Sequence, residues 1–168
     1  MTGPVYLATG NAGKAAELGR LLDCEVLPVP DWDAPEEDGA TFADNARIKA
    51  RAGAARCPGA WVVADDSGLE VDALDGGPGV RTKRYAGPAA TDADNNAKLL
   101  GALRGLPPER RGARYVCVLA LALPEAAGPR GGLPLTITRG TCRGRIADEL
   151  RGVGGFGYDP LFVPADGP

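Results

Sequence analysis

The sequence predicts one α/β domain built on a mixed β-sheet, and three observations lead to this class. Apolar runs rich in β-branched residues alternate with helical patterns over residues 5–104. Two long strand-like segments follow at 113–123 and 135–146, and a turn-rich stretch joins them as in a hairpin. The length of 168 residues and the apolar fraction of 44% suit a single domain with a substantial core. We therefore expect residues 1–168 to form one domain, with no repeat and no linker.

The first half of the chain predicts two helices between short strands. Prolines at 28, 30 and 35 interrupt regular structure before the second helix. Thr41 and Asp44 form an approximate capping box at the start of that helix, and Pro58-Gly59 stops it after Arg56. The expected elements are a strand at 5–8, a helix at 12–23, a strand at 25–29, a helix at 41–56 and a strand at 61–64.

The second half predicts one more helix and the long strand pair. Thr91 and Asp94 repeat the capping pattern, and Gly105 with Pro107-Pro108 ends this helix. The alternation of Thr136, Ile137 and Thr138 indicates that one face of its strand meets water. The expected elements are a strand at 69–72, a loop at 75–79, a helix at 91–104, strands at 113–123 and 135–146, a turn-rich connection at 124–134 and a strand at 161–163.

Composition excludes several classes of function. The net charge of −3 argues against general nucleic-acid binding, and no apolar run resembles a signal peptide or a membrane span, so we expect a cytoplasmic location. Four dispersed cysteines give no zinc or disulfide framework. The absence of histidine removes serine triads and Cys–His pairs from this chain. Any acid–base chemistry must use carboxylates, Lys, Tyr or metal-bound water.

The adjacent acids Asp65 and Asp66 are the strongest chemical signal. They follow the apolar run 61–63, so we place them where a buried strand ends, with no basic neighbour in sequence. Hard carboxylate oxygens in this setting suit Mg²⁺. The alternative is that Asp-Asp-Ser-Gly is an ordinary turn, since all three residue types favour turns.

A glycine-containing segment between the first strand and the first helix predicts a phosphate cradle. Backbone N–H groups, the start of a helix and the Lys14 charge would together hold an anion. The segment is no Walker A loop, because its spacing is shorter and Ala15 follows the lysine. An ordinary strand–helix turn with an exposed lysine explains it equally well. The cradle residues are Thr9, Gly10, Asn11, Ala12, Gly13 and Lys14.

Two further polar groups could serve the same ligand. The run Glu36-Glu37-Asp38 lies in a loop, where a solvated charge cluster is the usual explanation. Thr41, Asn45 and Lys49 recur every fourth residue and so form one stripe on the second helix. This stripe fits a ligand-facing row, and a surface row explains it as well.

The run Gly152-Val153-Gly154-Gly155-Phe156-Gly157 has the letters of a dinucleotide fingerprint but the wrong context. Such a fingerprint follows the first strand and opens a helix, whereas Pro160 opposes a helix here. We interpret the segment as a lid or base-binding loop in which Phe156 stacks on a purine. The alternative is that Phe156 and Tyr158 anchor a glycine hinge in the core.

Taken together, the segments resemble the inosine/xanthosine triphosphate pyrophosphatase (Ham1-like) family. Five separated motifs occur in the family order over nearly the whole chain. They are Leu-Ala-Thr-Gly-Asn-Ala-Gly-Lys at 7–14 with Glu17; Thr41-Phe42 with Asn45-Ala46 and Lys49-Ala50; Ala64 to Leu69 with Val71 to Leu74; Gly77 to Val80 with Arg84 to Gly87; and Gly154 to Pro160.

The resemblance implies Mg²⁺-dependent hydrolysis of ITP, dITP and XTP to the monophosphate and pyrophosphate. It also implies an elongated mixed sheet flanked by helices in two lobes with a central cleft, and a homodimer. By position, Thr9 to Lys14 with Ser67 would hold the triphosphate, and the stripe residues Asn45 and Lys49 would face it. Glu36 and Asp66 match metal positions, with Asp65 a further candidate, and Asp66 matches the general base. Phe156, Gly157, Tyr158 and Asp159 match the nucleobase loop.

The chain departs from the family pattern in two places. It reads Thr82-Lys83-Arg84-Tyr85 where the family has Ser-Ala-Arg-Tyr. It also stops at Pro168, before the family's final helical segment with its Lys and Ser-His-Arg motif, so we expect a missing C-terminal tail and weakened base discrimination. Two other functions stay open: a pyrophosphatase for other modified nucleotides, and a nucleotide-binding protein without activity.

Overall fold

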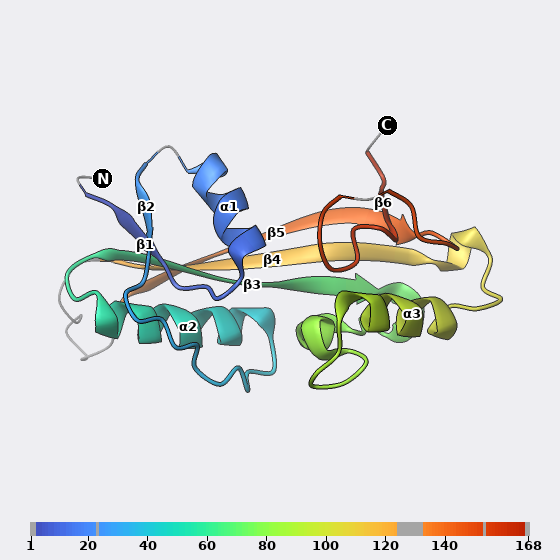
Figure 1. The fold of residues 1–168 in the computed structure, drawn as a ribbon, viewed down its shortest axis with the longest axis horizontal. Coiled ribbons are helices and arrows are strands. Elements are labelled where there is room, and N and C mark those ends of the chain that lie inside the picture. The colour runs from blue at the N-terminus through green and yellow to red at the C-terminus, as the bar shows by residue number, and fades with distance from the viewer. Residues whose placement is uncertain (1–2, 23, 124–132, 153, 167–168) are drawn as a thin grey trace. The chain divides into compact units, whose positions relative to one another are not determined.

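The computed structural model of the chain describes residues 3–22, 24–123, 133–152 and 154–166, and they form an α/β fold around a mixed sheet (Figure 1). The helices are α1 (Ala12–Leu21), α2 (Phe42–Arg56) and α3 (Asp92–Ala102), with short segments of tighter helix at η1 (Asp72–Leu74), η2 (Gly79–Arg84) and η3 (Pro108–Arg110). The strands are β1 (Val5–Leu7), β2 (Val26–Pro28), β3 (Trp61–Val71), β4 (Gly112–Ala122), β5 (Leu135–Ile146) and β6 (Phe162–Pro164).

The sheet has the strand order β2-β1-β3-β4-β5-β6. The strand β1 pairs in parallel with both β2 and β3, whereas β5 and β6 pair antiparallel. Parallel neighbours need crossover connections, and α1 and α2 supply them between β1, β2 and β3. The predicted class, α/β with a mixed sheet, is therefore confirmed.

The chain forms two compact units, each made of two segments. Unit 1 comprises residues 1–66 and 118–139, and unit 2 comprises residues 67–117 and 140–168. The long strands β3, β4 and β5 each contribute residues to both units. The expectation of a single domain over 1–168 remains a prediction.

In unit 1, α1 and α2 lie on opposite faces of the sheet (Figure 1). Val63 packs with Val5 and Leu7 on the α1 face, which Ala15 and Leu18 of α1 cover. On the other face α2 approaches closely through small residues. A Cβ added at Gly53 would lie 2.8 Å from Val62 and 2.9 Å from Ala8, so only glycine allows this spacing.

Unit 2 has its own core, built from α3, the second half of β3 and the end of the chain. Its buried members are Leu69, Val71, Leu99, Leu103, Ala113, Ile146, Tyr158 and Leu161. The buried Arg111 lies beside it and donates to three backbone carbonyl oxygens: Leu103 at 2.9 Å, Ile146 at 2.8 Å and Ala147 at 2.6 Å. These bonds satisfy a cation that would otherwise be costly to bury.

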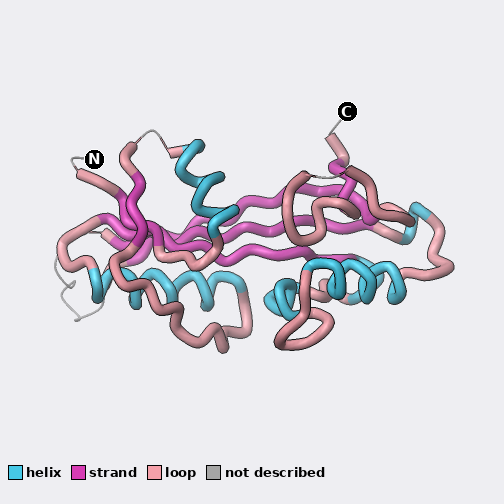
Figure 2. The backbone as a smooth tube through the Cα atoms, viewed as in Figure 1, coloured by secondary structure: helices cyan, strands magenta, loops and turns pink. Residues whose placement is uncertain are grey.

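One predicted boundary was wrong in a way that matters for the site. Two strands at 61–64 and 69–72, with Asp65 and Asp66 in a turn between them, were expected; the structure has the single strand β3 from Trp61 to Val71 (Figures 1 and 2). The strand lies inside the sheet between β1 and β4, where neighbours pair its backbone groups. This tertiary pairing overrides the turn preference of Asp, Ser and Gly.

The remaining elements appear close to their predicted ranges. The helices are one to three residues shorter than expected at their ends, as fraying and capping make usual. The expected loop at 75–79 is preceded by η1 and merges into η2. The predicted connection at 124–134 lies largely outside the described residues. Over the part of the chain that the structure describes, we find no helix long and apolar enough to cross a membrane.

Candidate active site

The strand β3 places Asp65 and Asp66 on opposite faces of the sheet. Successive side chains of a strand alternate between its faces. Val62 faces α2 and Val63 faces the α1 side, so the alternation assigns Asp65 to the α1 face and Asp66 to the α2 face. Both carboxylates are buried, at 2% and 8% exposure. The two acids therefore have different partners rather than one shared environment.

Asp65 receives the lysine of the predicted phosphate cradle. Lys14, in the first turn of α1, places its Nζ 2.6 Å from Oδ2 of Asp65. The Lys14 side chain is 19% exposed and that of Asp65 is 3% exposed. The alternative of an exposed lysine on an ordinary turn is wrong for Lys14, since its charge is directed at the strand.

The backbone of the cradle is held by its own side chains. Oδ1 of Asn11 accepts from the N–H groups of Gly13 at 2.9 Å and Lys14 at 3.2 Å, and so caps α1. Oγ1 of Thr9 accepts from the N–H of Asn11 at 3.2 Å. The N–H groups of residues 11, 13 and 14 are thus already bonded within the segment.

Asp66 is held by the stripe on α2. Nδ2 of Asn45 donates to Oδ2 of Asp66 at 3.0 Å, and Nζ of Lys49 lies 3.5 Å from Oδ1. Asn45 and Lys49 are both buried, whereas Thr41 is exposed and caps the helix. The stripe is therefore not a surface row, and two of its three members converge on one carboxylate.

Burial raises the pKa of the Asp66 carboxyl above its ordinary value. The Lys49 charge and the Asn45 hydrogen bond act in the opposite direction, and the nearby charge of Lys14 also lowers this pKa. A carboxylate with a raised pKa, fixed by a neutral donor and a cation, has the character of a general base.

The acidic loop approaches Asp66 through Glu37 rather than Glu36. Oε2 of Glu37 lies 3.2 Å from Nζ of Lys49, so this lysine lies between two carboxylates. The loop is tied to α2 because the N–H of Gly39 donates to Oδ1 of Asn45 at 2.8 Å. Glu36 and Asp38 are exposed. The assignment of Glu36 to a metal remains a prediction.

The oxygen donors around Asp66 suit Mg²⁺ in chemical type. Among the described residues, no three acidic or cysteine side chains are grouped closely enough to hold an ion unaided. Mg²⁺ commonly binds through one or two carboxylates together with substrate phosphates, so such a triad is not required. Asp66 fits this pattern, and Glu37 is the loop carboxylate whose charge acts on it.

Unit 2 contains the predicted base loop. Phe156 is 39% exposed, whereas Tyr158 is buried and donates its hydroxyl to the carbonyl oxygen of Thr82 at 2.9 Å. Oδ2 of Asp159 accepts from the N–H of Phe156 at 2.9 Å. The hinge-anchor alternative is thus correct for Tyr158 and wrong for Phe156. Ser67 is half-buried on β3.

Sequence reasoning missed several contact residues. Glu37 was not separated from its acidic neighbours, because nothing in a charge run distinguishes its members. Asp92 and Asn96 of α3, and Tyr115 of β4, all bond to the base loop from distant sequence positions. The one signal in the sequence was Asn96, an amide on the apolar side of a capped helix.

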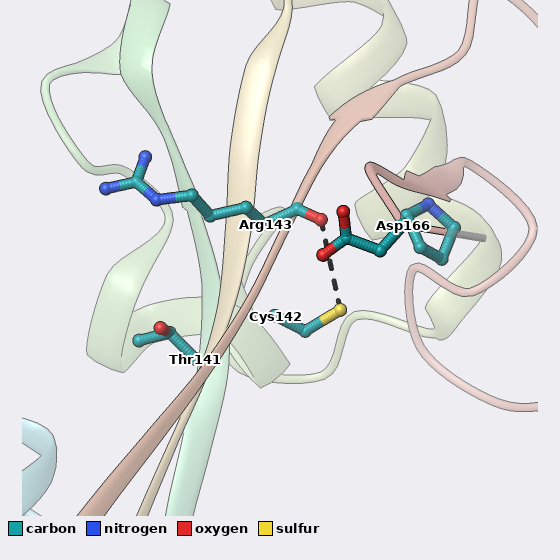
Figure 3. A pocket seen from close by; sticks show the side chains of 5 residues that line it. Thr141, Cys142, Arg143 and Asp166 are labelled. Atoms are coloured by element: carbon teal, nitrogen blue, oxygen red, sulfur yellow. Dashed lines mark hydrogen bonds between the residues drawn. The ribbon is translucent and has the colours of Figure 1, made fainter.

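A separate hollow of about 460 Å³ lies in unit 2 at β5 and β6 (Figure 3). It is lined by Thr141, Cys142, Arg143, Pro164 and Asp166. Figure 3 shows Arg143 directed away from Asp166, and Sγ of Cys142 lies 3.9 Å from the carbonyl oxygen of Arg143. The hollow contains none of the predicted site residues.

The comparison with known proteins decides the family. The Ham1 family model matches residues 5–167. The chain belongs to the Ham1 family. Ham1-family relatives include a dITP/XTP pyrophosphatase from Desulforamulus reducens, 49% identical over 164 residues that cover 94% of this chain and 78% of the relative. A dITP/XTP pyrophosphatase from Nocardia farcinica is 49% identical over 172 residues, covering 97% and 80% of the two chains.

Solved Ham1 structures share the fold. A HAM1 protein from Coxiella burnetii has a TM-score of 0.79 at 41% identity, covering 95% of this chain and 80% of that one. The Staphylococcus aureus Ham1 protein has a TM-score of 0.77 at 39% identity with the same coverage. The family resemblance drawn from the sequence motifs is confirmed.

Proposed function

We propose that this Ham1-family chain hydrolyses non-standard purine nucleoside triphosphates, namely ITP, dITP and XTP, to the monophosphate and pyrophosphate. It is a hydrolase acting on phosphoric anhydrides. Relatives named dITP/XTP pyrophosphatases, about half identical over nearly the whole chain, support this activity. The observation that carries the proposal is the buried carboxylate of Asp66 on β3, which Asn45 and Lys49 of α2 contact.

In the proposed reaction Asp66 is the general base. Its Oδ1 or Oδ2 takes a proton from a water molecule whose oxygen attacks the α-phosphorus. The bond from this phosphorus to the bridging oxygen breaks, and pyrophosphate leaves with that oxygen. Asn45 and Lys49 orient the carboxylate, so that its proton-accepting oxygen is fixed before the substrate binds.

We assign the triphosphate to the cradle residues. When the triphosphate binds, the Lys14 ammonium would leave Asp65 and pair with phosphate oxygens. Lys49 supplies a second cation near the reacting carboxylate. Ser67, next to Asp66 in the chain, would add a hydroxyl donor. The segment Phe156 to Asp159 is proposed to contact the base, with the exposed ring of Phe156 available for stacking.

Three finer statements rest on the resemblance. Mg²⁺ is the proposed ion, held by Asp66 with Glu36; Asp65, the further candidate, lies on the other face of the sheet beside Lys14. When bound, it would neutralise charge on the phosphate oxygens. A homodimer and a cytoplasmic location are proposed in the same way; light scattering on the purified chain tests the dimer.

One assay tests the function. The protein is incubated with ITP, XTP, ATP, GTP and dUTP, each with and without MgCl₂, and pyrophosphate and monophosphate are measured separately. We expect equal amounts of pyrophosphate and monophosphate from ITP and XTP, in the presence of Mg²⁺ only. Release of inorganic phosphate, or a preference for ATP or dUTP, would refute the proposal.

A further inference from the structure

The helix α3 holds one residue of the proposed base loop, Gly157, through both of its backbone polar groups. Oδ2 of Asp92 accepts from the N–H of Gly157 at 2.7 Å, and Nδ2 of Asn96 donates to the carbonyl oxygen of Gly157 at 2.9 Å. Asp92 and Asn96 lie four residues apart, which puts them on one face of the helix. Both polar groups of Gly157 are thus fixed by side chains more than sixty positions away.

A second pair of contacts fixes the backbone of the neighbouring residue, Phe156. The N–H of Phe156 donates to Oδ2 of Asp159 at 2.9 Å, and Oδ1 of the same carboxylate accepts from the hydroxyl of Tyr115 at 2.9 Å. Gly155 has φ of +81°, and a Cβ there would meet the Asp159 carboxylate. The backbone is therefore constrained on both sides of Phe156, while its ring is left partly exposed.

Asn96 lowers the stability of the folded chain if its only role is packing. Asn96 is buried at 5% exposure, and its Oδ1 has no hydrogen-bond partner among the described residues. An apolar side chain of similar size at this position would avoid the cost of a buried oxygen without a partner. Local rules are broken in this way mostly where function requires it.

We infer that Asp92 and Asn96 are positioning residues that orient the backbone of Gly157 and so hold the ring of Phe156 ready to stack on a purine base. The inference rests on the proposed function, because it takes the loop to be the base-binding element. It adds two residues of α3 that the family motifs do not include. An aromatic ring fixed in advance loses less entropy on stacking than a mobile one. The bonds from Asp92 and Asn96 to Gly157 should therefore strengthen base binding specifically.

The chain offers a matched control next to each residue. Asn95 is also a buried amide on α3, but it bonds to the η2 region: its Oδ1 accepts from the N–H of Ala86 at 2.8 Å and its Nδ2 donates to the carbonyl oxygen of Lys83 at 3.1 Å. Asp94 is an acid in the same helical turn as Asp92, and it caps α3. Changes at Asn95 and Asp94 remove side-chain hydrogen bonds of the same helix without removing a bond to Gly157.

The test compares two ligands by titration calorimetry on the full chain with MgCl₂. Inosine monophosphate carries the base, and pyrophosphate lacks it. Asn96→Ala and Asp92→Ala should each raise the Kd for inosine monophosphate about tenfold and leave that for pyrophosphate unchanged, the effect expected from losing one hydrogen bond to a fixed element. Asp92→Asn keeps an acceptor oxygen and should retain most of the affinity. Asn95→Ala and Asp94→Ala should lower Tm without changing the ratio of the two Kd values.

The outcomes separate this inference from the proposed function. If the unaltered chain binds neither ligand and hydrolyses no ITP, the proposed function fails, and this inference with it. If the unaltered chain binds both, but Asn96→Ala changes the ratio no more than Asn95→Ala, only the positioning role is refuted. An equal loss of affinity for both ligands in Asn96→Ala would also refute it, because it would indicate general unfolding.

Discussion

Asp66 combines burial, a cation and an amide donor at one carboxylate, and its replacement gives the sharpest test of the site. Asp66→Asn keeps the side-chain shape but cannot accept a proton, so kcat for ITP should fall by about 10³-fold. Initial rates of pyrophosphate release measure this. Turnover within tenfold of the unaltered enzyme would show that another group is the base.

The same substitution should leave a folded and more stable protein. Folding raises the pKa of Asp66, so the folded chain binds this proton more tightly than the unfolded chain does. The stability that results is fully present below the unfolded pKa and is lost as pH rises through the folded pKa. At pH 7 the buried carboxylate therefore costs stability, and Asp66→Asn should raise Tm. A lower Tm at pH 7 would contradict this sign.

The pH profile of catalysis depends on the same group. The ionised carboxylate is the active form, so the acidic limb of kcat/KM should lie above the ordinary pKa of Asp. Lys49→Met removes a charge that lowers this pKa and should move the limb to higher pH. Arg47→Met, on the same helix but paired with Asp44, is the control and should leave the limb in place. An unmoved limb in Lys49→Met would exclude Asp66 as the titrating group.

Lys14 should influence both stability and binding. Lys14→Met leaves the buried Asp65 without its ion pair, which should destabilise the protein by about 1–3 kcal/mol, less than for a fully buried pair because Lys14 is partly exposed. The double variant Lys14→Met/Asp65→Asn should recover part of this loss. Urea unfolding measures the stability, and KM for ITP should rise in both variants. An unchanged KM would remove Lys14 from the cradle.

At the scale of elements, spacing of α2 against the sheet decides whether Asn45 and Lys49 reach Asp66. Gly53→Ala would place a methyl group 2.8 Å from Val62, which pushes the helix and strand apart. We expect a loss of about 1–3 kcal/mol from overpacking and a fall in kcat. The control Gly19→Ala lies on α1 where the added Cβ meets nothing within 4 Å. Similar losses in both variants would refute the spacing argument.

The sequence was most informative where local chemistry decides the structure. Thr41 and Thr91 cap their helices as predicted, because a side-chain oxygen beside unsatisfied N–H groups acts within one turn. The strand β3 was mispredicted, since its turn-forming residues are overruled by neighbours from distant parts of the chain. Sequence spacing also could not tell that the pleat separates Asp65 from Asp66, because that required knowing the strand continued.

The sequence indicated which residue types belong to the site, but it did not show which of these residues contact one another. Asn45, Lys49 and Asp66 lie together on the α2 face of the sheet in unit 1, whereas Lys14 pairs with Asp65 on the other face. The acid that contacts Lys49 is Glu37, which the sequence analysis did not select. An acidic run in a loop carries no periodicity, so its sequence cannot show which member turns inward. The contacts of α3 with the base loop join residues 61 and 65 positions apart, beyond the reach of any local pattern.

At the scale of the whole molecule, the two units share three strands, and this should make unfolding cooperative. Leu99→Ala removes a fully buried side chain from the core of unit 2 and should cost about 2–5 kcal/mol. Trp32 and Trp61 both belong to unit 1, so their fluorescence reports on that unit. We expect the fluorescence and circular dichroism transitions to shift together in urea. A shift confined to circular dichroism would show that the units unfold independently.

The hydrogen bonds of Arg111 to three carbonyl oxygens also determine when unit 2 can fold during synthesis at the ribosome. Residues 146 and 147 supply two of its acceptors, so Arg111 cannot complete its bonds until residue 147 has emerged from the ribosome. Unit 1 needs the chain only as far as residue 139. Unit 1, which holds Asp66, can therefore fold first on a nascent chain, whereas the core around α3 is complete only after Leu161 has left the exit tunnel.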